Sequence, residues 1–173
     1  EGHVWSWGYN GYGELGNGTT TSSTEKVQVK SPDGEGVLEN IVAISAGNYH
    51  SMAIDKEGNV YTWGYNQNGQ LGDGTTTNSS EFKQVPNLTD VIQISAGSNT
   101  MHVLKKDGTV WMAGLNSDGQ LGIESTESQS TFVQVKNEDG TGYLTNIKSI
   151  SAGQYTMFAI TNDGEVYGWG SNR

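Results

Sequence analysis

The sequence predicts an all-β fold assembled from small antiparallel sheets that repeat along the chain. Residues 40–66 read NIVAISAGNYHSMAIDKEGNVYTWGYN, in which three apolar segments of strand length are separated by GNYH and DKEG. Val, Ile, Tyr and Trp favour strands, and the intervening Gly, Asn and Asp favour turns. The same pattern recurs at residues 87–116 and 146–172. Each copy is therefore predicted to be a three-stranded meander.

Three short signatures recur in one register and define the repeat. Gly8, Gly64, Gly114 and Gly170 follow one another at intervals of 50 or 56 residues. The segment ISAG stands at 44–47, 94–97 and 150–153, and ELG or QLG stands at 14–16, 70–72 and 120–122. We divide the chain, as one partial domain over 1–173, into repeats 4–59, 60–109 and 110–165 and the start of a fourth at 166–173.

The first strand is expected at residues 4–8, VWSWG, with equivalents at 60–64, 110–114 and 166–170. Both faces of this strand carry apolar side chains, which indicates a sheet that is covered on both sides, as in stacked propeller blades. Polar loops at 19–24, 75–80 and 124–130 come next, each followed by a short strand at 26–29, 82–85 or 132–135. Successive blades along the chain would then contain two, four, four and three strands. We therefore expect about three blades, with broken blades at both ends.

Composition excludes several classes of function. The chain has 19 acidic residues against nine Lys and Arg, a net charge of −10, which argues against binding to a phosphate backbone. It has no cysteine, so neither disulfides nor thiol chemistry are available. No apolar run approaches the ~18 residues that a membrane span needs. Glu1 and Gly2 lead directly into a predicted strand, so we expect that the chain starts within a longer architecture.

The sequence contains fragments of nucleotide-binding and catalytic motifs, but the residues around them do not fit these functions. Gly11, Gly13 and Gly16 match the dinucleotide fingerprint GxGxxG, but no helix start follows them. His50 and Ser51 invite a nucleophile–base interpretation, but neighbours on a strand point to opposite faces. A histidine that bonds to backbone beside a turn is the commoner case. No carboxylate pair or His cluster indicates acid–base catalysis or a metal, so we expect no catalytic residue, no metal and no cofactor.

The segments AGNYHSMAI and GNVYTWGYNQNGQLG, with the ISAG copies, resemble the regulator of chromosome condensation repeat family. Its repeats carry AGxxHTxAL followed by GxVYxWGxNxxGQLG. Thr100 and Thr156 depart from the histidine of that pattern, and Ala113 departs from its tryptophan. The resemblance implies a β-propeller, usually of seven four-stranded blades, with the ISAG strand innermost. Seven blades need more than twice this length, so we expect either a fragment or self-association through open blade edges.

Strand alternation in such a blade places the turn after the first strand and the loop after the third strand on the same face. Tyr, Asn, Ser and Gly in these loops are typical of adaptable protein-binding surfaces. The opposite face carries the charged turns around Lys56 and Lys106. Alternatively, each asparagine caps a turn and each tyrosine packs a loop. The predicted partner-binding residues are Tyr9, Asn10, Tyr12, Asn48, Tyr49, Tyr65, Asn66, Asn68, Asn99, Asn116, Asp118 and Tyr155.

We therefore expect a non-enzymatic protein-interaction scaffold with a protein partner of unknown identity. The family's namesake is a nucleotide exchange factor for a small GTPase, which makes exchange activity the first alternative, by analogy of fold alone. An enzyme or a sugar-binding module is the second. A plant light receptor of this family uses a GWRHT motif, and the matching GNYHS here gives light sensing no support. The Thr- and Asn-rich loops and the absence of cysteine resemble a bacterial secreted or surface protein.

Overall fold

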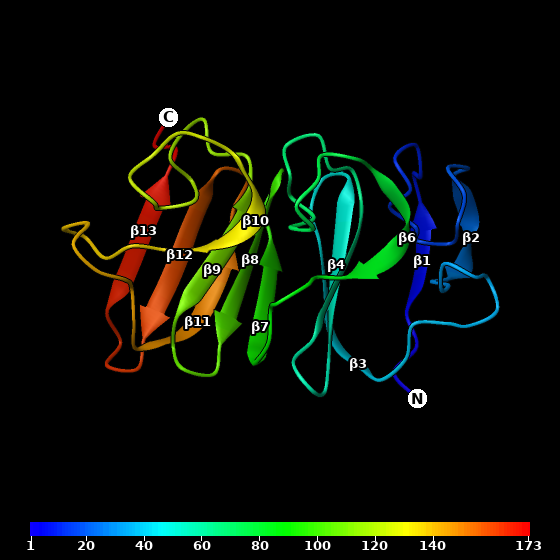
Figure 1. Cartoon of the computed structure of the whole chain (residues 1–173), viewed down its shortest axis with the longest axis horizontal. Helices are drawn as coiled ribbons and strands as arrows, with labels where there is room; N and C mark the ends of the chain where they lie inside the picture. Colours follow the sequence, from blue (N-terminus) through cyan, green and yellow to red (C-terminus); the bar gives the residue numbers. More distant parts are fainter.

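The computed structural model describes residues 1–173 and contains 13 strands and no helix. The strands form four antiparallel sheets that lie side by side along the molecule (Figure 1). The first sheet contains β1 (Trp5–Gly8) and β2 (Ser23–Gln28). The second contains β3 (Ile41–Ala46), β4 (His50–Asp55), β5 (Val60–Gly64) and β6 (Ser79–Gln84). The third contains β7 (Val91–Ala96), β8 (Thr100–Lys105), β9 (Val110–Gly114) and β10 (Gln129–Gln134), and the fourth contains β11 (Ile147–Ala152), β12 (Thr156–Thr161) and β13 (Val166–Gly170).

The sheets therefore contain two, four, four and three strands, which confirms the expected incomplete ring of about three blades. Neighbouring strands in each sheet are consecutive in the sequence, as in a meander. Each complete sheet takes two strands from one repeat and two from the next, because each begins at an ISAG strand. No helix exists that could cross a membrane.

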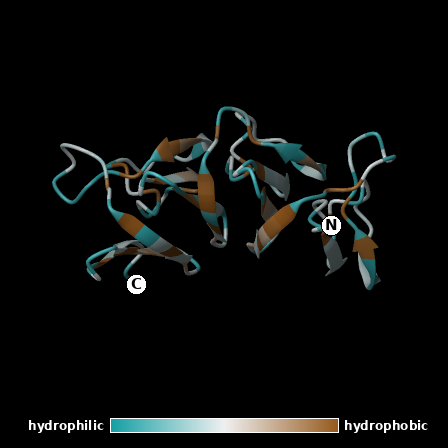
Figure 2. Ribbon diagram, turned by 90° about the horizontal axis from the view of Figure 1, so that it is seen from below, coloured by the Kyte–Doolittle hydropathy of each residue, from teal (hydrophilic) through white to brown (hydrophobic).

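The hydrophobic core lies between the sheets rather than within one layer. Hydrophobic segments lie mainly in the strands and hydrophilic segments in the connecting loops (Figure 2). One buried cluster joins the second and third sheets and includes Met52, Leu71 and Met101; another joins the third and fourth sheets. The central strands β4 and β8 are buried on both faces. The cover on both faces that the sequence predicts for residues 4–8 and their equivalents holds for β5 and β9, but β1 and β13 are largely exposed because they lie in the incomplete end sheets.

The three ISAG strands β3, β7 and β11 lie next to one another at the inner edge of their sheets. Side chains rather than a strand ladder connect them. Ser45 Oγ accepts a hydrogen bond from Ala96 N, and Ser95 Oγ accepts one from Ala152 N, each at 3.0 Å. The Gln93 amide also accepts from Ile150 N at 3.0 Å. A short hydroxyl at this position thus satisfies a backbone N–H that has no partner in its own sheet.

The outer strands differ from the expected bounds. Each begins three residues earlier than the short strands expected at 26–29, 82–85 and 132–135, and ends one residue earlier. The hydroxyl of Ser79 explains the earlier start of β6, because it accepts from Glu81 N and donates to Glu81 O at a register shift of the strand. Val29, Val85 and Val135 follow the strands as buried residues, and each belongs to a hydrophobic cluster between two sheets.

Strands β1 and β13 each have a single partner and so leave one edge free. Large apolar side chains are exposed there, including Trp7 on β1 and Val166 on β13. A cavity of about 390 Å³ lies between the first and second sheets and is lined by residues of β1, β3 and β4. Free edges with apolar side chains are prone to pair with another chain.

Candidate interaction face

One face of the molecule is built from two sets of loops. The turns 47–49, 97–99 and 153–155 follow the innermost strands, and the loops 9–22, 65–78 and 115–128 follow the third strands. Backbone hydrogen bonds of 2.8–2.9 Å from Tyr65 N to Tyr49 O, Leu115 N to Asn99 O and Ser171 N to Tyr155 O join the two sets. We call this surface the loop face. In Figure 1 the long loops lie at the top of the molecule.

Three asparagines at the same position of the repeat hold the long loops together. Asn10, Asn66 and Asn116 have no exposed surface. The Asn66 amide donates to Thr75 O and Thr77 O, each at 3.0 Å, and its Oδ1 accepts from Leu71 N at 2.9 Å. Asn10 and Asn116 make the equivalent bonds in their own loops. These side chains build the loops and do not reach the solvent-facing surface.

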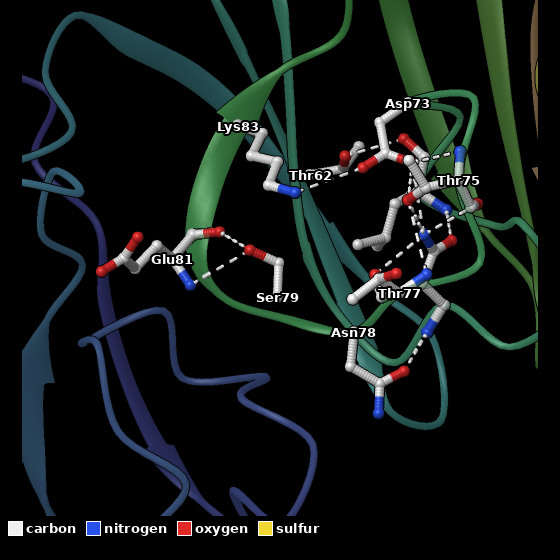
Figure 3. Close-up of polar contacts among 10 residues, drawn as sticks. Thr62, Asp73, Thr75, Thr77, Asn78, Ser79, Glu81 and Lys83 are labelled. Carbon is white, nitrogen blue, oxygen red and sulfur yellow. Dashed lines mark hydrogen bonds and ion pairs between the residues drawn. The ribbon is translucent and has the colours of Figure 1, made fainter.

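A second brace lies at Asp73 in the second long loop and at Asn17 in the equivalent position of the first, where Asn17 Oδ1 accepts from Thr19 N and Thr19 Oγ1. Asp73 Oδ1 accepts from Thr75 N at 2.9 Å and from Thr75 Oγ1 at 2.7 Å, while Lys83 Nζ lies 3.4 Å from Asp73 Oδ2. Asp73, Thr75 and Thr77 lie close together in this loop, with Lys83 extending toward them from β6 (Figure 3). These hydrogen bonds favour the ionised carboxylate and hold the pKa of Asp73 below its ordinary value in spite of partial burial. A surface on such a loop is largely pre-formed.

Four of the predicted residues gather into one aromatic cluster. The rings of Tyr9, Tyr12, Tyr49 and Tyr65 meet edge to face, with centroids of contacting pairs 4.9–6.3 Å apart. Tyr9 is 57% exposed and Tyr49 is 42% exposed. We call these four residues the tyrosine cluster. It joins the first sheet's loop to the turn and loop of the second sheet.

Sequence comparison identifies the repeat. The profile of the regulator of chromosome condensation (RCC1) repeat matches residues 1–54 and 57–104, and a second profile of the same repeat matches 41–70, 91–120 and 147–173. The chain belongs to the RCC1 repeat family. The resemblance to this family that the sequence motifs indicate is thereby confirmed.

Curated RCC1 relatives match about half of the chain. The mitochondrial RCC1 domain-containing protein RUG3 of Arabidopsis thaliana is 39% identical over 90 residues, which are 52% of this chain and 19% of that protein. The ultraviolet-B receptor UVR8 of the same plant is 33% identical over 89 residues, 51% of this chain and 19% of that protein. The matches thus cover about a fifth of the length of these relatives. They give no support to a bacterial or surface origin.

Solved structures establish the fold as a partial β-propeller of the RCC1 type. Human WBSCR16 superimposes with a TM-score of 0.83 at 22% identity, over 98% of this chain and 43% of that one. Prp20p of Saccharomyces cerevisiae superimposes with a TM-score of 0.76 at 24% identity, over 99% of this chain and 40% of that one. At this identity the likeness shows the fold alone.

The remaining predicted residues are spread along the loop face of the RCC1 blades. Asn48 is exposed, and Asn68, Asn99, Asp118 and Tyr155 are partly buried. Two of them make polar side-chain contacts with residues distant in the sequence: Asp118 Oδ1 lies 3.2 Å from the Arg173 guanidinium, and Asn99 Oδ1 is 3.5 Å from Gln70 Nε2. The structure therefore concentrates the aromatic residues at the first sheet boundary and leaves Asn99, Asp118 and Tyr155 outside the tyrosine cluster.

Glu14 is a site residue that the sequence analysis did not select. It occupies the first position of the ELG signature, where the other RCC1 repeats carry Gln70 and Gln120. Its Oε2 accepts from Tyr12 N at 2.8 Å, whereas its Oε1 is buried and has no hydrogen-bond partner. Partial desolvation raises the pKa of the Tyr9 hydroxyl, with further contributions from Tyr12, Glu14 and Tyr49. The exchange of Gln for Glu was the signal available in the sequence.

His50, at the histidine position of the RCC1 repeat, and His102, on the neighbouring strand β8, are both buried. His50 Nε2 lies 3.2 Å from Thr100 O in the next sheet, and Thr100 Oγ1 lies 3.1 Å from His102 Nε2. Ser51 Oγ donates instead to Glu14 O at 3.0 Å, on the other side of β4. His50 and Ser51 thus have different partners, as strand geometry predicts. No three His, Asp or Glu side chains come together in a way that would hold a metal ion.

The long loops of the loop face are acidic. Loops 9–22, 65–78 and 115–128 contain five carboxylates and no Lys or Arg. Three of these carboxylates are paired: Asp73 with Lys83 and Glu124 with Lys136 at 3.4 Å, and Asp118 with Arg173 at 3.2 Å, which leaves Glu14 and Glu127 without an ion pair. The turns at the opposite ends of the strands carry both signs of charge, with Lys56 next to Glu57 and Lys106 next to Asp107. The loop face therefore presents aromatic and negatively charged groups together.

Proposed function

We propose that this chain is a non-enzymatic protein-interaction module that binds a protein partner through its loop face. The observation that carries the proposal is the tyrosine cluster, because exposed aromatic rings gathered on pre-formed loops are the usual anchors of protein interfaces. Buried Asn10, Asn66 and Asn116 act indirectly in this proposal, since they fix the loops that present the rings.

Two structures of one relative, yeast Prp20, support a protein partner. The structure of yeast Prp20p is described with its binding properties to Gsp1p and histones, and another structure shows yeast RCC1 (Prp20) bound to Kap60. Those partners belong to those proteins. For this chain they support only the general idea that an RCC1 propeller serves as a binding surface.

Affinity capture with matched variants tests the proposal. Tyr49→Ala combined with Tyr65→Ala removes two anchors of the tyrosine cluster, and Lys56→Ala combined with Lys106→Ala alters the opposite face. We expect the tyrosine variant to lose a partner that both the wild-type chain and the lysine variant retain. Retention of every partner by the tyrosine variant would contradict the proposal.

Nucleotide exchange on a small GTPase is the second candidate, and the RCC1 repeat itself is what favours it. Release of fluorescent GDP from a small GTPase, with and without the chain, separates the two. Acceleration of release would favour the exchange factor; partner capture without acceleration would favour the scaffold. The remaining alternative, an enzyme or a sugar-binding module, has no assembled set of polar groups in its favour.

Self-association through the free edges of β1 and β13 is a separate proposal. The exposed apolar side chains on both strands support it. Multi-angle light scattering of the 173-residue chain checks it, and a monomer at all concentrations would contradict it.

A further inference from the structure

The boundary between the first and second sheets differs from the next boundary along the chain. Tyr12, Tyr49 and Tyr65 meet there. At the same three repeat positions the boundary between the second and third sheets carries Asn68, Asn99 and Leu115. The first boundary therefore has an aromatic surface that the fold of the repeat does not require.

Glu14 differs from Gln70 at the same position of the repeat, whereas the third counterpart, Gln120, also has a buried atom without a partner, its Nε2. Gln70 uses both ends of its side-chain amide, because Oε1 accepts from Asn68 N at 3.0 Å and Nε2 lies 3.5 Å from Asn99 Oδ1. Glu14 repeats the first contact, at 2.8 Å from Tyr12 N, but places an oxygen where the amide has its N–H group. This second oxygen is buried and has no donor. A buried carboxylate oxygen without a donor is costly, and a positive group would relieve that cost.

We propose that the tyrosine cluster and Glu14 form a site for a cationic side chain, arginine or lysine, in a basic segment of the protein partner. This inference rests on the proposed function and adds the chemistry of the partner to it.

The rings supply the first attraction. A guanidinium or ammonium group binds over the face of an aromatic ring within about 6 Å of its centroid, because the face is the negative part of the ring quadrupole. The edge-to-face arrangement leaves ring faces turned in different directions, and Tyr9 and Tyr49 are open to solvent. A cation can therefore contact more than one ring.

The carboxylate supplies the second attraction. Charges interact more strongly across partly buried surroundings than across water, so a cation among these rings would gain from the charge of Glu14. No Lys or Arg stands in the long loops to neutralise that charge from within the chain. The net charge of −10 also favours encounter with a basic partner. One carboxylate beside phenol rings is a poor ligand set for a metal ion, which leaves an organic cation as the fitting ligand.

Nuclear magnetic resonance of the full chain, with ¹³C-labelled tyrosine rings, tests the site. The probe is acetyl-tetraarginine amide, with acetyl-tetraglutamine amide as its uncharged control. We expect the arginine peptide alone to shift the ring signals of the tyrosine cluster, while those of Tyr143 and Tyr167 stay unchanged. Glu14→Gln should weaken the binding roughly threefold to thirtyfold.

Asp118→Asn is the matched control, because it removes one negative charge from the same face at a residue outside the cluster. The variants Tyr12→Asn and Tyr49→Asn introduce residues that the second repeat carries at these positions, and Glu14→Gln does the same, so all three suit the fold. We expect the two tyrosine variants to weaken binding and Asp118→Asn to leave it within twofold. Circular dichroism melting of each variant confirms folding.

Two results would overturn the inference: no shift of the cluster signals with the arginine peptide, or equal weakening by Glu14→Gln and Asp118→Asn. The first result together with tyrosine-dependent capture of a partner would leave the proposed function standing. Arginine binding at the cluster, together with partner capture that the tyrosine substitutions leave unchanged, would instead count against the proposed function.

Discussion

Trp63 in the second sheet donates its indole N–H to the backbone carbonyl of Glu14 in the first sheet, with a distance of 2.8 Å. Trp169 in the fourth sheet makes the equivalent bond to Gln120 of the third sheet at 2.9 Å. Ala113 occupies this position in the third sheet, so the boundary between the second and third sheets lacks the contact. A single aromatic residue thus ties two sheets together and also holds the backbone of Glu14 in place.

Trp63→Ala should destabilise the chain by about 3–5 kcal/mol, because it leaves a cavity between two sheets. Trp7→Ala is the matched control, since Trp7 holds the same position in the first sheet but is 61% exposed. Urea unfolding of both variants checks the prediction. Equal losses would show that Trp63 is not buried between sheets in solution.

Asn66→Ala should cost about 2–4 kcal/mol, because it removes three hydrogen bonds to backbone groups and leaves these groups without partners. Gln67→Ala, one residue further along on the exposed surface of the same loop, should change stability by less than about 0.5 kcal/mol. Thermal unfolding of the two variants compares them directly. Hydrogen exchange at Leu71 N, which Asn66 binds, should accelerate only in Asn66→Ala.

Acid should weaken the contact between the second and third sheets. Burial lowers the pKa of His50 to about 4 and that of His102 to about 3, from an ordinary 6.5, and the charge of His50 adds to the shift at His102. The unfolded chain therefore binds more protons than the folded one between pH 6.5 and about 4. Stability should be complete above pH 6.5 and fall below it by about 1.4 kcal/mol per pH unit for each histidine.

The variant His50→Thr with His102→Met tests this slope. Thr100 and Met52 occupy the corresponding positions in neighbouring repeats, so both replacements suit the fold. Urea unfolding between pH 7 and 4.5 should give a much flatter profile than in the wild-type chain. The lowered pKa values of Asp55 and Asp73 act below this window, because their contribution is lost only as pH falls from 3.8 toward their folded pKa values. An unchanged slope would refute the role of the histidines.

The sequence predicted the number and order of strands because turn residues and apolar segments alternate at a fixed period. It placed Asn10, Asn66 and Asn116 on the binding surface, where the structure has them buried. A residue that recurs in every repeat serves the geometry of the repeat, whereas Tyr12 and Glu14 depart from the repeat and so mark a local specialisation. The first sheet boundary was not predictable from spacing alone, since the aromatic contacts join residues up to 53 positions apart.

A comparison of Gly16 with Gly18 distinguishes two reasons for glycine at these positions: a backbone conformation with positive φ, and a lack of space for a Cβ. Both have positive φ, +64° and +80°, so alanine at either position should lose about 1–2 kcal/mol through backbone strain. A Cβ on Gly16 would lie 2.9 Å from Trp63 Nε1 and 3.1 Å from Val29 Cγ1, whereas one on Gly18 would meet nothing within 4 Å. Gly16→Ala should therefore cost about 1–3 kcal/mol more than Gly18→Ala.

A double-mutant cycle identifies the source of that difference. In a Trp63→Ala background the indole no longer occupies the space beside Gly16, but Val29 Cγ1 remains there. Gly16→Ala should then cost less than in the wild-type chain and still more than Gly18→Ala, and the two substitutions should be coupled by about 1–2 kcal/mol. Gly18→Ala should remain additive with Trp63→Ala. No coupling at Gly16 would mean that Gly16 is needed for its backbone conformation and not for the packing of one sheet against the next. Equal coupling at Gly18 would mean that the coupling does not arise from the contact between Gly16 and Trp63.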